Sequence, residues 1–230
     1  VAAGERGRDL VAKMLAFSRS EAHAPRRTVD ALAVAREVAT LLREILPSSM
    51  RLMVVETTSA PLVRMDAVDL HQALVNLVVN ARDAIEPHGA ITLTVHAEAP
   101  AHGHCASCLA PLDGQRYVAV SVRDDGAGMA PDLLSRIFDP FFTTKAVGHG
   151  SGMGLSVVHG VTHQSGGHVQ VESAPGAGTE FRLLLETGAP ADESAGAAAD
   201  AATPPGATDY SGLRVLVVDD EPSVRAFVEE

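Results

Sequence analysis

Apolar residues recur at helical spacing over residues 66–86, and the surrounding chain is organised around this stretch. The apolar positions are Leu70, Leu74, Leu77, Val78, Ala81 and Ile85, and they predict a helix that is buried around most of its circumference. One stripe is polar and falls at steps of four, four and three: Gln72, Asn76, Asn80 and Asp83. Such a stripe either bonds to neighbouring backbone or faces a polar ligand or its metal ion, because unpaired buried amides are costly.

The same patterns predict the rest of the fold. Helical spacing predicts further helices at residues 4–20, 30–46, 133–138 and 153–165. Alternating or β-branched runs predict strands at residues 51–58, 91–97, 117–123, 168–173 and 179–186, with residues 28–30 short and extended. The fold class that follows is α+β, a two-layer sandwich of helices on a mixed β-sheet.

Two composition changes divide the chain. Residues 188–211 are mostly Ala, Gly, Pro, Asp and Thr, which predicts a disordered linker. From residue 212 an apolar strand, LRVLVV, ends at Asp219 and Asp220, and in this chain we interpret these acids as a helix cap. The start at Val1 and the abrupt end at Glu230 suggest a piece of a longer protein.

Charge and composition exclude several functions. The net charge of −11 argues against a nucleic-acid partner. No apolar run approaches the ~18 residues of a membrane span, and the first residues lack the apolar core of a signal peptide. Two cysteines without a disulfide framework suit a reducing compartment. We therefore expect a cytoplasmic domain, although a membrane anchor elsewhere in the parent protein is compatible with this.

Three further stretches carry polar groups that a fold alone does not require. In residues 124–129, glycines allow close backbone approach and a carboxylate can accept from an amino group. Residues 137–145 place Thr and Lys after an aromatic and proline anchor, within reach of a phosphate. Residues 148–155 open a helix on glycines, which makes an anion site. Each is weak alone, but together, in this order and with these spacings, the three stretches are a strong signal of a functional site.

With these motifs, residues 28–187 resemble the catalytic ATP-binding domain of sensor histidine kinases, which share the Bergerat fold with gyrase and chaperone ATPases. The matching boxes are Asn76 and Asn80 (N box), Asp124, Gly126 and Gly128 (G1 box), Phe138, Pro140 and Phe141 (F box), and Gly150, Gly152 and Gly154 (G2 box). Met153 and Asp125 are mild departures from the usual pattern.

The resemblance implies roles for individual residues. Asn76 and Asn80 would hold Mg²⁺ and the phosphates, with Asn80 as the metal ligand, and Lys145 would join them in catalysis. Asp124 would bond the adenine amino group. The remaining ATP-binding residues would be Asp83, Gly126, Gly128, Met129, Phe138, Phe141, Thr144, Gly150, Gly152, Met153, Gly154 and Leu155. Residues 138–145 would form the near edge of an ATP lid, and we expect residues 141–152 to be mobile without nucleotide.

The resemblance also implies the function and partners. Residues 1–24 resemble the second helix of a dimerisation and phosphoacceptor hairpin, and residues 212–230 resemble the start of a receiver domain, so the parent would be a homodimeric hybrid kinase. ATP would phosphorylate a hairpin histidine and then an Asp of the receiver or of a response regulator. None of the ten histidines here is followed by Asp or Glu, as the family's acceptor is, so we expect that the acceptor is not in this chain.

Two other functions remain open. One is an ATP-hydrolysing member of the fold, but those members place a Glu where this chain has Asn76, which cannot accept a proton from water. The other is a nucleotide-sensing module without phosphotransfer.

A Cys/His-rich loop adds a separate question. His102, His104, Cys105 and Cys108 could supply four zinc ligands, although adjacent His104 and Cys105 would have difficulty in binding one ion and the spacing matches no standard site. A redox C-x-x-C pair and a plain polar loop are the alternatives.

Overall fold

The computed structural model describes residues 28–57, 62–98, 103–112, 116–145 and 151–188. These residues belong to the first of two compact units, Val1–Pro190, and the second unit is Ala191–Glu230. The predicted helix at residues 4–20, the linker and the start of a receiver domain lie outside the described residues, as does part of the predicted lid.

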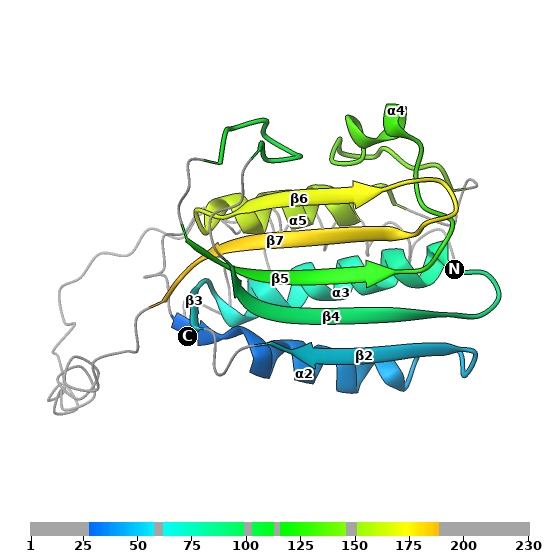
Figure 1. The fold of residues 1–230 in the computed structure, drawn as a ribbon, viewed down its shortest axis with the longest axis horizontal. Helices are drawn as coiled ribbons and strands as arrows, with labels where there is room; N and C mark the ends of the chain where they lie inside the picture. The colour runs from blue at the N-terminus through cyan, green and yellow to red at the C-terminus, as the bar shows by residue number, and fades with distance from the viewer. Residues whose placement is uncertain (1–27, 58–61, 99–102, 113–115, 146–150, 189–230) are drawn as a thin grey trace, which may run out of the picture. The chain divides into compact units, whose positions relative to one another are not determined.

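A five-stranded sheet forms one layer of the domain (Figure 1). Its order is β2 (Met50–Glu56), β4 (Gly89–Glu98), β5 (Tyr117–Asp124), β7 (Thr179–Glu186) and β6 (His168–Ser173). Strands β2 and β4 are parallel, and all other neighbours are antiparallel, so the sheet is mixed as the sequence predicts.

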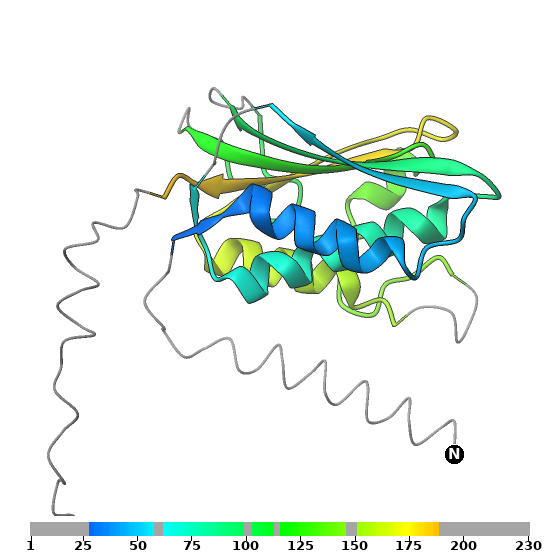
Figure 2. The same cartoon turned by 90° about the horizontal axis from the view of Figure 1, so that it is seen from below.

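Three helices form the second layer, and Figure 2 shows them together on one face of the sheet. They are α2 (Ala31–Arg43), α3 (Ala67–Ala84) and α5 (Gly154–Gln164), and α3 contacts both of the others. This arrangement confirms the predicted α+β fold of helices on a mixed sheet. None of the helices in the described ranges is long and apolar enough to cross a membrane.

Local sequence signals explain where the long helices begin. Asp30 caps α2 by accepting from the backbone N–H groups of Leu32 and Ala33, and Asp66 caps α3 by accepting from Val68 at 2.8 Å. Each cap stabilises its helix by about 1 kcal/mol.

Two short elements differ from the sequence expectations. Strand β3 (Leu62–Arg64), which pairs with β1 (Thr28–Asp30), is absent from the elements that the sequence predicts. The predicted helix at residues 133–138 was wrong in its bounds: α4 is Pro131–Leu134. Pro131 favours the first helical turn, and after Leu134 the chain closes i→i−3 turns instead of helical bonds.

Candidate nucleotide site

A cavity of about 1170 Å³ lies where the polar stripe of α3, the carboxyl end of β5 and the first turn of α5 meet. The loop after β5 and the segment Phe142–Lys145 complete its wall. Its lining combines amide, carboxylate and ammonium groups with apolar side chains. This volume and mixed chemistry suit a ligand larger than a single metal ion or anion.

Asp124 ends strand β5 and is almost fully buried, at 5% exposure. Its Oδ1 accepts from the backbone N–H groups of Gly126 (2.9 Å) and Thr179 (3.2 Å), which fixes the carboxylate. No described residue donates to Oδ2, so this oxygen can accept from a ligand. Burial raises the pKa of the Asp124 carboxyl above its ordinary value, although the two N–H donors oppose the shift.

The loop after Asp124 requires glycine at two positions. A Cβ on Gly126 would lie 2.5 Å from the carbonyl oxygen of Ala84. Gly128 has φ +65° and a Cβ there would collide with the carbonyl of Ala174. These glycines let the loop lie flat against α3 and the β6–β7 hairpin.

The polar stripe of α3 faces the first turn of α5. A Cβ on Gly154 would lie 3.5 Å from both Asn76 Oδ1 and Asn80 Nδ2. Asn76 and Asn80 are half-buried and line the cavity, while Val78 on the opposite side of α3 is buried in the core. The positive end of α5 and two amide side chains are thus combined in one wall, an arrangement that can bind phosphates.

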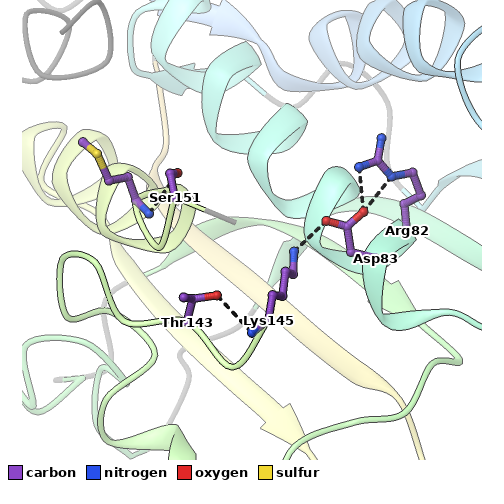
Figure 3. Close-up of polar contacts among 6 residues, drawn as sticks. Arg82, Asp83, Thr143, Lys145 and Ser151 are labelled. Atoms are coloured by element: carbon purple, nitrogen blue, oxygen red, sulfur yellow. Dashed lines mark hydrogen bonds and ion pairs between the residues drawn. The ribbon is translucent and has the colours of Figure 1, made fainter. Parts of the chain in front are cut away.

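An ion pair joins the end of α3 to the segment that follows α4 (Figure 3). Lys145 Nζ lies 2.6 Å from Asp83 Oδ2, and Arg82 donates to Asp83 Oδ1 at 2.8 Å. Burial alone would raise the pKa of the Asp83 carboxyl, but the bonds from Lys145 and Arg82 outweigh burial and hold the pKa below its ordinary value. Asp83 therefore stays anionic and positions the Lys145 ammonium at the cavity.

Most of the residues expected at the site line this cavity. They are Asn76, Asn80, Asp83, Asp124, Gly126, Gly128, Met129, Thr144, Lys145, Gly152, Met153, Gly154 and Leu155. Gly150 lies outside the described residues.

The aromatic residues at the site differ from the expectation. Neither Phe138 nor Phe141 is among the described residues that line the cavity: Phe138 packs against the core, and Phe141 is 58% exposed. Phe142 lines the cavity instead, with the Arg136 guanidinium 4.6 Å from its ring centroid.

Two lining residues on β7, Thr179 and Phe181, were not expected. The antiparallel register places Thr179 opposite Asp124, and Phe181 lies two residues further along β7. The turn APGAG before β7 predicted the strand, but sequence alone did not show which strand it pairs with.

The Cys/His loop is placed away from this cavity, and its expected ligand set is corrected. Cys105 and Cys108 lie with His163 and His168, from α5 and β6, and not with His104, which is exposed. His102 lies outside the described residues.

The fold and the cavity suit a nucleotide-binding domain, and comparison with known families identifies the class of protein. Residues 65–189, more than half of the chain, match the family model described as histidine kinase-, DNA gyrase B-, and HSP90-like ATPase. The chain belongs to this family.

Named relatives are sensor kinases. Sensor kinase CckA of Brucella abortus (strain 2308) is 37% identical over 224 residues, which is 96% of this chain and 23% of that protein. Sensor histidine kinase ZraS of Escherichia coli (strain K12) is 40% identical over 125 residues, 54% of this chain and 23% of that protein. The chain therefore spans about a quarter of the length of these relatives.

Solved structures agree in fold. Full-length ShkA in complex with AMPPNP superposes with a TM-score of 0.64 at 28% identity, over 82% of this chain and 38% of that chain. The mycobacterial sensor histidine kinase MprB superposes with a TM-score of 0.57 over 70% of this chain and 97% of that chain, and at 23% identity this likeness shows the fold alone.

Proposed function

We propose that residues 28–187 are the ATP-binding catalytic domain of a hybrid sensor histidine kinase. The proposal rests on one observation: the two ends of the cavity have different chemistry. A buried, fixed Asp124 stands at one end, and Asn76, Asn80 and the first turn of α5 stand at the other. The match to a sensor kinase along 96% of the chain supports assigning the domain to a kinase.

At the base end, Asp124 Oδ2 accepts a hydrogen bond from the adenine amino group. An ionised carboxylate can only accept hydrogen bonds. It therefore binds a base that has an amino donor at this position and disfavours a base that has a carbonyl there. Gly126 and Gly128 keep the backbone clear for the ring, and Met129 lines the cavity beside it. The site therefore selects ATP over GTP.

At the phosphate end, the amides of Asn76 and Asn80 and the N–H groups that open α5 receive the triphosphate. Asn80 would hold Mg²⁺ through its amide oxygen, because Mg²⁺ prefers oxygen ligands and binds together with substrate phosphates. Lys145, positioned by Asp83, neutralises charge on the transferring phosphoryl group. When bound, Mg²⁺ would supply positive charge that stabilises the phosphates during transfer.

The phosphoryl acceptors belong to other parts of the protein. The γ-phosphoryl group passes to a histidine on a dimerisation hairpin, of which residues 1–24 are the second helix, and then to an Asp of a receiver domain that begins near residue 212. Position 76 carries an amide and no general base for water, which favours transfer to a histidine over hydrolysis.

Calorimetric titration of the chain with ATP and Mg²⁺ tests the proposal. Asp124→Asn exchanges an acceptor for a group that can present a donor to the adenine amino group, so affinity should fall at least about tenfold, or ~1.4 kcal/mol. Asp132→Asn, an exposed aspartate of α4 outside the cavity, is the matched control and should bind as the unmodified chain does. Equal affinity of the two variants would remove Asp124 from the site.

A further inference from the structure

Away from the nucleotide cavity, two thiols and two imidazoles converge on one point. Cys105 and Cys108 come from the loop between β4 and β5, His163 from the last turn of α5, and His168 from the first position of β6. One potential ligand atom from each residue lies within 4.8 Å of all the others. Nothing in the nucleotide site uses these side chains.

The separations resemble the edges of a tetrahedral metal site. Zinc bonds of about 2.3 Å to sulfur and about 2.0–2.1 Å to nitrogen give edges of about 3.6 Å between S and N ligands. Cys105 Sγ lies 3.5 Å from His163 Nε2, and Cys108 Sγ lies 3.9 Å from His168 Nδ1. Since all separations are below 4.8 Å, shifts of no more than about 1.5 Å would bring the four atoms to zinc-binding distances.

Neighbouring groups orient two of the four ligands. The His163 Nδ1–H donates to the carbonyl oxygen of His159 at 2.8 Å, because a carbonyl can only accept. This bond fixes the tautomer that leaves the Nε2 lone pair directed at Cys105. Outer-shell bonds of this kind are typical of histidines that bind metals. The Val169 N–H donates to Cys105 Sγ at 3.4 Å and stabilises a thiolate there.

The backbone holds the cysteine loop in a specific conformation. Ala106 donates to the carbonyl of Val169 at 2.7 Å, which fastens the loop to the outer edge of β6. Cys105 donates to the carbonyl of Ala110 at 2.9 Å, so the turn around Cys108 is closed. Leu109 has φ +61° and is 74% exposed, so its unfavourable backbone conformation is not offset by burial of its side chain. Strained backbone conformations of this kind are frequent at ligand-binding sites.

We propose that Cys105, Cys108, His163 and His168 bind one zinc ion in a closed, four-coordinate structural site. The spacings C-x₂-C and H-x₄-H fall within those of zinc sites of the Cys₂His₂ type. Thiolate and imidazole ligands favour zinc over Mg²⁺ or Ca²⁺, which prefer oxygen. With four protein ligands no position remains open, so the ion stabilises the fold and performs no chemistry.

The site would join the β4–β5 loop to the end of α5. Helix α5 begins at Gly154 in the wall of the nucleotide cavity, and its last turn carries His163. Zinc would therefore stabilise the helix whose other end forms the proposed phosphate site. The proposal does not depend on the identity of the nucleotide.

The test uses the 230-residue chain, reduced and stripped of metal, titrated with zinc in competition with a chromophoric chelator. We expect one zinc per chain, and Co²⁺ in its place should give the visible spectrum of tetrahedral thiolate coordination. Cys108→Ser and His168→Ala each remove one ligand, and each should weaken zinc binding more than the about 10–100-fold that loss of an outer-shell partner costs. His104→Ala, on the same loop but outside the cluster, should bind zinc unchanged.

A second measurement reports on folding. Zinc should raise the thermal unfolding midpoint of the unmodified chain and of His104→Ala, but not of Cys108→Ser or His168→Ala. Absence of zinc binding by the reduced, folded chain would overturn the proposal, as would a Cys105–Cys108 disulfide that persists in excess thiol. Equal zinc affinity of His104→Ala and both ligand variants would overturn it as well.

Discussion

Lys145 Nζ lies 2.6 Å from Asp83 Oδ2, so the segment after α4 is held to the last turn of α3 by an ion pair that lines the cavity. A bound triphosphate would compete with Asp83 for the same ammonium group. Both side chains remain partly exposed, at 33% and 23%, so water screens the attraction between them. The pair therefore positions a cation at the site without contributing much to the stability of the fold.

Lys145→Met separates these two roles. We expect the affinity for ATP to fall about tenfold, or ~1.4 kcal/mol, because a charge that faces the phosphates is lost. The free energy of unfolding in urea should change by about 1 kcal/mol or less, as for other partly exposed pairs. Arg51→Met, which removes an exposed cation of β2, is the matched control. A large loss of stability with normal ATP affinity would make Lys145 a structural residue.

Two glycines of the same motif should respond differently to alanine. Gly152 has φ +66° and a Cβ there would collide with the backbone of Phe141, so Gly152→Ala should destabilise the domain by about 1–3 kcal/mol. Gly154 is helical, and a Cβ there would meet the Asn76 amide at an ordinary 3.5 Å. Gly154→Ala should fold normally but bind ATP more weakly, because its methyl group occupies the proposed phosphate site. Urea unfolding and calorimetry measure both effects, and equal stability of the two variants would contradict this account.

Asn80→Ala tests the proposed metal contact. If the Asn80 amide oxygen binds Mg²⁺, the variant should lose much more ATP affinity in Mg²⁺ than in EDTA, where the unmodified chain lacks that contact too. Gln170→Ala removes an amide from β6, outside the cavity, and should have no effect in either buffer. Equal losses for Asn80→Ala in both buffers would indicate that Asn80 has a structural role only.

The pH dependence of ATP binding should show the protonation of the Asp124 carboxyl. Its pKa is raised above the ordinary 3.8 mainly by burial, so protonation begins at a higher pH than for an exposed aspartate. The protonated carboxyl loses acceptor capacity, so ATP affinity should fall as pH decreases through this raised pKa. Asp124→Asn cannot titrate and should lack this step, while the protonation of the ATP phosphates is common to both proteins. Superimposable pH profiles would contradict the assignment.

The sequence predicted the elements with strong local signals. Asp66 and the apolar spacing after it located α3, and the glycine-rich turn located β6 and β7 at their observed bounds. The polar stripe on α3 and the order of the glycine motifs predicted most of the cavity wall. Each of these features is encoded within one short stretch of sequence, so it can be predicted without knowing how distant segments pack.

Features that depend on long-range packing were missed. Thr179 and Phe181 reach the cavity because β7 pairs with β5, and no residue in β7 specifies that partner. The sequence groups Cys105 and Cys108 with their neighbours His102 and His104. In the folded domain Cys105 instead contacts His163, 58 residues further along the chain, once α5 has packed. Spacing alone cannot indicate such a meeting.

The central claim is that this cavity binds ATP through its base as well as through its phosphates. Calorimetric titration of the unmodified 230-residue chain with ATP and with GTP, each with Mg²⁺, tests this claim most directly. We predict one ATP per chain and at least about tenfold weaker binding of GTP, because the guanine carbonyl would face the Asp124 carboxylate. Equal affinity for the two nucleotides, or no binding of ATP, would contradict the account.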